Sequence, residues 1–203
     1  MEQIQNKKKE INRKIAVVGA LGALTVVMTV ARIGFIPWFS VSITILHIPV
    51  IIAVFLEGLW AGVGVGAIFG LSSLVMSSIS PTSPLDMFFV NPLVSVVPRM
   101  LFAVVTYFLL KGLLKLSKNK KSILVYIFYA IAAFVGTMVH SFFVLGILVL
   151  KKAIDWTVMV GVLAGNSLLE AAAAVVISLA VVSVMNIAET RKNKKSKLNS
   201  NIE

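Results

Sequence analysis

Hydrophobic residues fill almost the whole chain between residues 15 and 187, whereas the two ends are polar and basic. Charged residues, Pro and Gly pairs and a Ser/Thr-rich loop divide this stretch into six apolar segments. The segments are residues 15–33, 42–56, 61–76, 91–114, 123–150 and 157–187. Their apolar runs are continuous and do not alternate, which is typical of lipid-spanning helices. Because about 20 helical residues cross the hydrocarbon layer, the pattern predicts an all-α membrane protein with six transmembrane helices.

The polar ends carry no apolar periodicity. We expect residues 1–14 and 188–203 to be solvated, flexible tails. They flank one six-helix membrane domain, residues 15–187. Segments 42–56 and 61–76 are short for a full crossing, so these helices are either tilted or sheltered by the rest of the protein.

Composition favours a membrane protein and excludes several other classes. Of the 203 residues, 59% are hydrophobic and 13% are charged, whereas about 25% of residues are charged in soluble domains. An ordinary soluble enzyme and a disordered chain are therefore excluded. The sequence has no cysteine, which also excludes disulfide bonds and thiolate chemistry.

Basic residues indicate how the helices are oriented. With six crossings, both tails lie on one side, together with the connections after the second and fourth helices. That side carries 15 Lys and Arg residues, the opposite side carries 3, and Arg99 lies within a helix. Since basic residues concentrate in cytoplasmic segments, we expect both termini in the cytoplasm. The same asymmetry accounts for the net charge of +11 without a nucleic-acid partner.

Six polar residues lie inside the predicted helices, where polar groups are costly and commonly functional. They are His47, Asn91, Arg99, His140, Asn166 and Glu170. Counted at about 1.5 Å per helical residue, all of them lie in the outer half of the membrane or near its midplane. This distribution indicates a pocket that opens to the outside.

Each of these residues also has a structural interpretation. Arg99 either pairs with Glu170 or binds an anionic ligand. The two histidines and Asn166 either contact a ligand or form hydrogen bonds between helices. Asn91 precedes a proline and is therefore also suited to capping a helix.

Motifs for catalysis and nucleotide binding do not occur in the sequence. It contains no HExxH, GxSxG or GxxxxGK[ST] pattern, and its two histidines lack the spacing of metal ligands. We therefore expect no enzyme activity, no cofactor and no bound metal. If the protein moves a solute uphill, the energy must come from a partner or from an ion gradient.

The first apolar segment carries small residues four positions apart. Ala16 and Ala20 form one such pair, and Gly19 and Ala23 continue the pattern. A face of small residues lets another helix approach closely, either within the protein or on a partner.

Several stretches carry a resemblance to a known family. They are the Ala16-x-x-x-Ala20 pattern and residues 43–52, 62–71 and 91–99. With six helices in about 200 residues, they resemble the substrate-binding S component of energy-coupling factor (ECF) vitamin transporters, over about residues 15–187. The last three stretches are similar to the branch that includes pantothenate and folate carriers. The family has Gly-Pro before its third helix, where this chain has Glu57-Gly58-Leu59.

The resemblance implies a location, partners and a mechanism. An S component lies in the plasma membrane of a bacterium and captures a vitamin-like small molecule from outside. It docks on a T component that is coupled to two ATP-binding subunits. Ala16 and Ala20 match the family's docking motif. The loops that act as lids in the family correspond to residues 34–41 and 77–89 here.

The residue types of the predicted pocket indicate what kind of molecule it binds. The predicted substrate-binding residues are Trp38, His47, Phe88, Phe89, Asn91, Arg99, His140, Asn166 and Glu170. Arg99 offers a planar fork for a carboxylate. The amides and imidazoles suit hydroxyl or amide groups, and the aromatic side chains suit an apolar portion. A small acid with amide and hydroxyl groups, such as pantothenate, fits this set.

The sequence leaves three other functions open. An autonomous ion-coupled transporter of a small solute would use Glu170 as a proton site, although the polar residues stop before the inner side. An intramembrane enzyme would bring His47, His140 and Glu170 together on a metal. A scaffold without a ligand is the third alternative.

Overall fold

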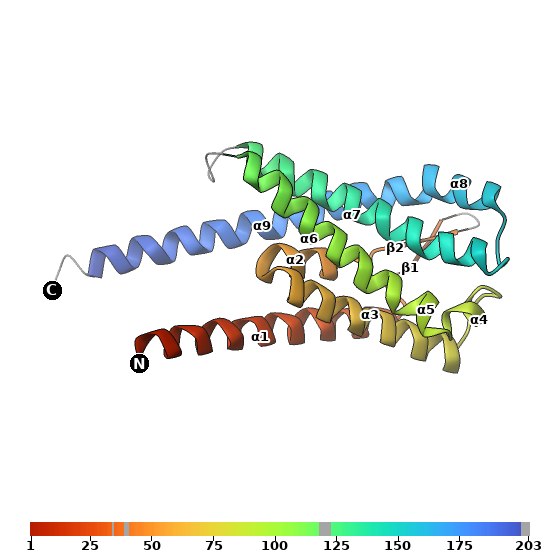
Figure 1. The fold of residues 1–203 in the computed structure, drawn as a ribbon, viewed down its shortest axis with the longest axis horizontal. Helices are drawn as coiled ribbons and strands as arrows, with labels where there is room; N and C mark the ends of the chain where they lie inside the picture. Colours follow the sequence, from red (N-terminus) through yellow and green to blue (C-terminus); the bar gives the residue numbers. More distant parts are fainter. Residues whose placement is uncertain (34, 39–40, 118–122, 200–203) are drawn as a thin grey trace.

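The computed structural model describes residues 1–33, 35–38, 41–117 and 123–199, which form an elongated helical bundle (Figure 1). The elements are α1 (Glu2–Val30), β1 (Phe35–Trp38), β2 (Val41–Thr44), α2 (Ile48–Glu57), α3 (Leu59–Ile79), α4 (Asp86–Phe89), α5 (Pro92–Ser95), α6 (Val97–Leu116), α7 (Ile123–Leu150), α8 (Trp156–Ala164) and α9 (Asn166–Asn199). The predicted predominance of helices therefore holds.

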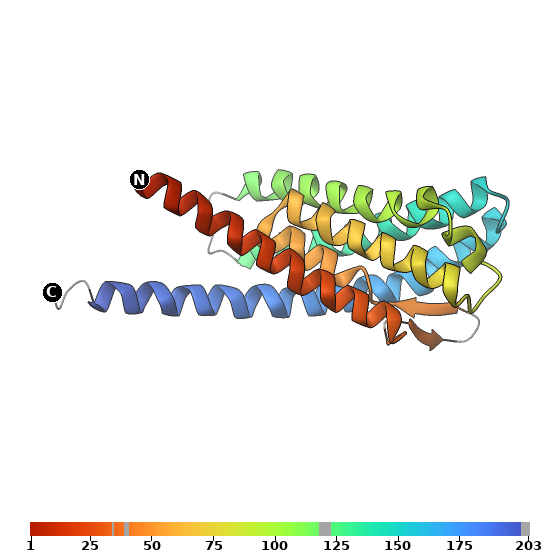
Figure 2. The same ribbon diagram turned by 90° about the horizontal axis from the view of Figure 1, so that it is seen from below.

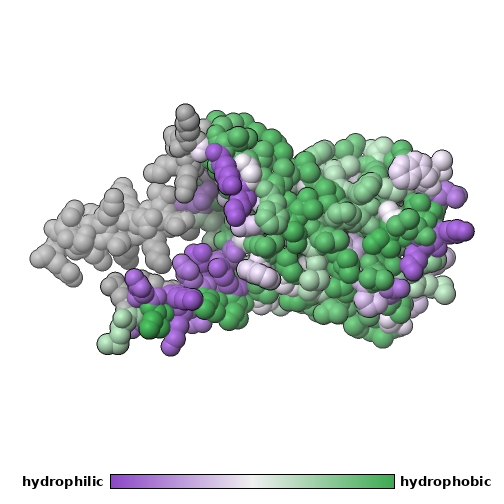
Figure 3. Space-filling model, in the orientation of Figure 1, coloured by the Kyte–Doolittle hydropathy of each residue, from purple (hydrophilic) through white to green (hydrophobic). Residues whose placement is uncertain are grey.

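Among the described residues, five stretches are long and apolar enough to cross a membrane. They are Gln3–Val30, Leu59–Ile79, Pro92–Leu116, Ile123–Leu150 and Trp156–Ile187. Apolar side chains cover the middle of the bundle, and hydrophilic ones gather towards its two ends (Figure 3). This distribution matches a lipid layer around the middle of the molecule, so the chain has the form of a multi-pass membrane protein.

The short helix α2 lies at the centre of the bundle. Its residues Ile48–Val54 are all buried, and it packs against α1, α3, α6, α7 and α9. Ten residues of helix measure about 15 Å, half of the hydrocarbon layer. Of the two alternatives for the short segment 42–56, the structure shows the sheltered one: protein surrounds α2 and supplies its apolar environment.

The predicted helix from residue 42 begins later than expected, because β1 and β2 form an antiparallel hairpin that ends at Thr44. Val41, Ile43 and Thr44 are β-branched and favour the extended conformation. Pro49 lies in the first turn of α2, where proline is accommodated without loss of a helical hydrogen bond. The hairpin is the one departure from an all-helical fold in the described residues.

The predicted segment 157–187 is also divided, at Gly165, into α8 and α9. Gly165 and Asn166 are weak helix formers, so an interruption is least costly there. The interruption places Asn166 at the first turn of α9, one turn before Glu170.

The ends of the chain differ from the predicted flexible tails. Helix α1 begins at Glu2, and α9 continues to Asn199. Extending a helix that already exists needs no new nucleation, and Lys, Glu and Arg are good helix formers. The Nε atom of Arg13 also lies 2.8 Å from a carboxylate oxygen of Glu57, which ties α1 to the end of α2.

Both termini lie at the same end of the bundle, and the hairpin, α4 and α5 lie at the opposite end (Figures 1 and 2). This arrangement separates the molecule into a basic end and an end built from short elements.

Glycines allow α3 to touch the α5–α6 region backbone to backbone. A Cβ atom at Gly66 would collide with the carbonyl oxygen of Arg99, and one at Gly70 would lie 2.8 Å from the carbonyl oxygen of Ser95. The hydroxyl of Ser95 donates to the Gly70 carbonyl at 2.9 Å. These contacts fix the position of Arg99 relative to α3.

Replacing Gly66 with alanine tests this close contact. We expect Gly66→Ala to destabilise the protein by about 1–3 kcal/mol, as overpacking of a core does. Thermal unfolding of the detergent-solubilised protein measures the effect. The control is Gly112→Ala, because a Cβ there meets nothing within 4 Å and alanine favours helix. Equal stability of the two variants would contradict the assigned contact.

Candidate functional site

Arg99 lies in the first turn of α6, 5% exposed, among aromatic rings. Its Cζ atom is 5.0 Å from the ring centroid of Phe89 and 5.3 Å from that of Phe69. One terminal nitrogen donates to the carbonyl of Val94 at 2.7 Å, and Nε has no hydrogen-bond partner. Cation–π contacts and one carbonyl thus hold the guanidinium in place.

No carboxylate of the described residues neutralises Arg99. The ion pair found in these ranges joins Arg13 to Glu57, so the alternative of an Arg99–Glu170 pair is not realised in this structure. A buried charge without a counter-charge is costly. The guanidinium therefore keeps free donor capacity at Nε.

The two histidines come together from different elements. The imidazole rings of His47, at the N-terminal cap of α2, and His140, on α7, are nearly parallel at 18°, with centroids 5.4 Å apart. Both are buried. The rings of Phe102 and His140 form a T-shaped pair with centroids 4.9 Å apart. Within the described part of the chain, neither ring nitrogen of either histidine completes a hydrogen bond of standard geometry, and the Thr44 backbone is a polar neighbour of the His47 ring.

Glu170 binds neutral donors of the protein. One of its oxygens accepts from the backbone nitrogen of Thr44 at 2.6 Å, from the Thr44 hydroxyl at 3.1 Å and from the Asn166 amide at 3.1 Å. The Ser141 hydroxyl is a further hydrogen-bonding neighbour. The carboxylate thereby joins β2, α7 and α9.

One apolar ring links the predicted residues into a cluster. Phe69 contacts the guanidinium of Arg99 and lies 5.9 Å from the His140 ring. Phe69 and Phe102 were not predicted from the sequence, because an aromatic residue in an apolar helix has no feature that separates a binding site from a core. Their position becomes apparent only when α3, α6 and α7 are packed together.

Other predicted site residues lie outside this cluster. Asn91 is exposed, and its side-chain oxygen accepts from the backbone of Leu93 at 2.9 Å, which is the helix-capping role. Phe88 is half-buried and packs on a smaller core that includes Val94 and Leu148. Trp38 is in β1, and its side chain lies outside the described residues.

The metal alternative also finds no support in the described ranges. His47, His140 and Glu170 do not form a group that could hold a metal ion there.

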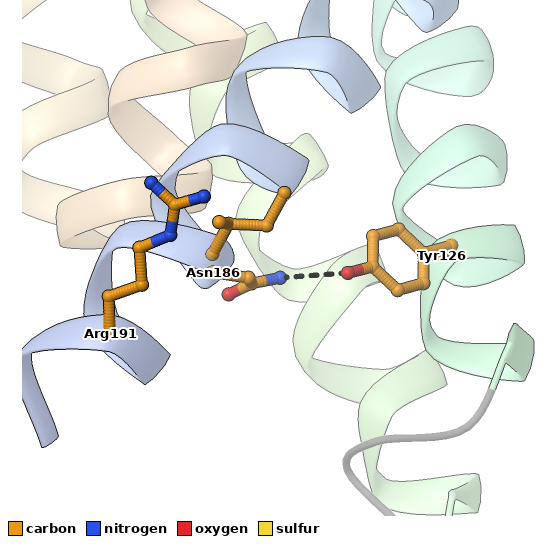
Figure 4. A pocket seen from close by; sticks show the side chains of 4 residues that line it. Tyr126, Asn186 and Arg191 are labelled. Carbon is orange, nitrogen blue, oxygen red and sulfur yellow. Dashed lines mark hydrogen bonds between the residues drawn. The ribbon is translucent and has the colours of Figure 1, made fainter. Parts of the chain in front are cut away.

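A surface pocket of about 260 Å³ lies away from the cluster, between α7 and α9 (Figure 4). It is lined by Tyr126, Asn186, Ile187 and Arg191, and the Asn186 amide donates to the Tyr126 hydroxyl at 3.3 Å. Tyr126 precedes His140 by fourteen positions on α7, about 21 Å along the helix. This pocket is therefore separate from the Arg99 cluster.

The small-residue pattern of α1 divides between two faces. Gly22 faces inward, since a Cβ there would collide with Ile68 of α3. Ala16, Gly19 and Ala20 are exposed. Beside them a pocket of about 350 Å³ opens between α1 and α3. The outward face of α1 is thus smooth and accessible to another helix.

The described parts of the two predicted lid loops, residues 35–38, 41 and 77–89, lie at the end of the bundle opposite the termini (Figure 1). The guanidinium of Arg32 donates to the backbone and side-chain oxygens of Ser80 at 2.6 and 2.8 Å, which ties the end of α1 to the end of α3. In the second loop, Asp86 accepts from both the backbone and the hydroxyl of Thr82, and from the backbone of Ser83.

The apolar body, the buried polar cluster and the exposed small-residue face define a multi-pass membrane protein with the organisation of a solute-binding subunit. Residues 13–190 match the model of the family described as ECF transporter, substrate-specific component, and the chain belongs to this family. No curated protein matches the chain. The match confirms the predicted resemblance to the S components of ECF transporters. Proteins of the family are transporter subunits and not enzymes; they bind a small-molecule substrate and act with T and ATPase components.

The second lid loop gives a pH-dependent prediction. Partial burial alone would raise the pKa of Asp86, but the hydrogen bonds from Thr82 and Ser83 outweigh it and lower the pKa. A lowered pKa means that the carboxylate stabilises the turn above the unfolded value of about 3.9. This stabilisation is lost as the pH falls through the lower, folded pKa.

We therefore expect the amide protection factors of Thr82 and Ser83 to fall below about pH 4. In Asp86→Asn they should be low at every pH, as hydrogen exchange would show. Asp155→Asn is the control, because the Asp155 side chain makes no capping hydrogen bond to α8. Unchanged protection in Asp86→Asn would contradict the anchoring role.

Proposed function

We propose that this chain is the substrate-capture subunit of an ATP-driven ECF importer for a small carboxylic acid taken up from outside. The observation that carries the proposal is Arg99, a buried guanidinium without a carboxylate partner in the described residues. Membership of the ECF substrate-specific family supports the transport role. A ligand carboxylate would supply the counter-charge that the protein does not.

Pantothenate is the substrate that we propose to test first. Its carboxylate suits the guanidinium, and its amide and hydroxyl groups suit the buried imidazoles near Arg99. The stretches 43–52, 62–71 and 91–99 support the pantothenate and folate branch. All three supply residues of the cluster, namely His47, Phe69 and Arg99.

We further propose that both termini face the cytoplasm and that the hairpin and α4 face the outside. The termini share one end of the bundle (Figures 1 and 2), and this end carries most of the basic residues. The Arg99 cluster then lies closer to the outer end, with the hairpin and α4 beside its entrance. Residues 15–187 would cross the plasma membrane six times, with β2 and α2 together forming the second crossing.

We propose that the exposed face of α1 docks on the T component of the importer. Ala16 and Ala20 are exposed on this face. The Arg13–Glu57 ion pair holds α1 against the α2–α3 turn on the same part of the helix. A partner helix would thus meet a fixed, smooth surface.

Substitution of Arg99 tests the anion anchor. We expect Arg99→Gln to cost about 2–5 kcal/mol of pantothenate binding, or roughly thirtyfold or more in Kd. Isothermal titration of the protein in nanodiscs measures this. Lys151→Gln, which removes an exposed positive charge, should leave the Kd within about twofold. An unchanged Kd in Arg99→Gln would exclude the anchor, and a wild-type protein that does not bind pantothenate would exclude this substrate.

Bulky substitutions on α1 test the docking face. Ala16→Trp and Ala20→Trp should each prevent co-purification with the T component and the ATPases, because the close helix approach is lost. Pantothenate binding should stay within about twofold of wild type. Val176→Trp, at an exposed position of α9, is the control. Assembly that survives both alanine substitutions would contradict the proposed surface.

A further inference from the structure

The stacked imidazoles of His47 and His140 leave an unusual number of buried polar atoms without partners. None of the four ring nitrogens completes a hydrogen bond of standard geometry in the described ranges, and the Thr44 backbone is a polar neighbour of the His47 ring. Buried polar groups are nearly always paired. A neutral imidazole carries one donor and one acceptor. Together, the two rings therefore offer two donors and two acceptors in an otherwise apolar interior.

A single carboxylate holds the two segments that carry these rings. Thr44, which donates twice to Glu170, lies three positions before His47. Ser141, a hydrogen-bonding neighbour of the same carboxylate, directly follows His140. Glu170 therefore fixes the start of α2 against α7, and with it the relative position of the two rings.

The Phe69 ring connects the histidine pair to Arg99. The Phe69 ring centroid lies 5.3 Å from the guanidinium carbon of Arg99 and 5.9 Å from the ring centroid of His140. The cation and the imidazoles are thus two polar points joined by one aromatic ring. An elongated molecule with a carboxylate at one end matches this order.

We propose that His47 and His140 form a second recognition point, which binds an uncharged hydroxyl or amide group of the substrate. Glu170 is the positioning residue that sets the ring geometry and does not itself contact the substrate. This inference rests on the proposed function and narrows the substrate to carboxylic acids with a neutral hydrogen-bonding group. A plain alkyl carboxylate would satisfy Arg99 and leave the imidazoles unpaired.

The first experiment tests, without any substrate, whether Glu170 positions the two imidazole rings. The sequence has two histidines, so ¹⁵N-histidine labelling gives ring signals for His47 and His140 alone. We expect Thr44→Val and Glu170→Gln to shift the signals of both rings. Thr106→Val is the matched control, because the Thr106 hydroxyl donates within its own helix, to Phe102. If the ring signals of His140 do not shift in Thr44→Val, the positioning role of Glu170 is overturned.

The second experiment compares the binding of pantothenate and heptanoate, an acid without hydroxyl or amide groups. Wild type should prefer pantothenate, and His47→Phe and His140→Phe should each reduce this preference about tenfold while heptanoate still binds. Glu170→Gln should reduce the preference less, and Thr106→Val should leave it unchanged. A preference that survives both histidine substitutions would overturn the recognition point.

The two arms separate this inference from the proposed function. If neither acid binds, or if Arg99→Gln leaves both affinities unchanged, the carboxylate-capture function fails, and the substrate part of the inference fails with it. If Arg99→Gln abolishes the binding of both acids while the histidine variants keep wild-type selectivity, the function stands and the histidine recognition point fails.

Discussion

The guanidinium of Arg99 lies in an apolar interior with a carbonyl and two aromatic rings as its neighbours. Burial removes the hydration of this charge, and contacts with the surrounding residues must offset that loss. The charge therefore constrains which groups pack around it. Gly66 and Gly70 bring α3 against the α5–α6 region, and Phe69 and Phe89 then cover the cation. The packing of these helices is thus organised around a charge that a ligand anion would neutralise.

The carboxylate of Glu170 has the opposite arrangement, since neutral donors of the protein surround it. The two buried charges therefore have different roles in our account. Glu170 joins the hairpin to α9 and holds the histidine segments together, whereas Arg99 keeps donor capacity for a ligand. The difference is a physical one: one oxygen of the Glu170 carboxylate already accepts three hydrogen bonds from the protein, whereas the Nε donor of Arg99 has no partner in the described residues.

The two ends of the bundle differ in construction. Short elements and the hydrogen-bonded loops around Ser80 and Asp86 form one end. Long helices form the other end (Figure 1), which carries most of the basic residues. In the proposed orientation, substrate entry uses the end made of short segments, where local rearrangement disturbs few packed contacts. In the same proposal, the partner would dock on the exposed face of α1 that carries Ala16 and Ala20.

The sequence by itself determined the membrane class, the long helices near residues 61–76, 91–114 and 123–150, and the family resemblance, because these depend on local hydrophobicity and short motifs. It also singled out Arg99, His47, His140 and Glu170, since polar residues stand out in apolar helices. The hairpin before α2, the interruption at Gly165 and the helical ends were not predicted. They depend on packing and helix continuation beyond a local window.

Only the tertiary structure decided that Glu170 binds Thr44 instead of Arg99, that Asn91 caps a helix, and that Phe69 and Phe102 join the cluster. Which polar groups meet is a matter of three-dimensional distance, which residue type and spacing along one helix do not contain.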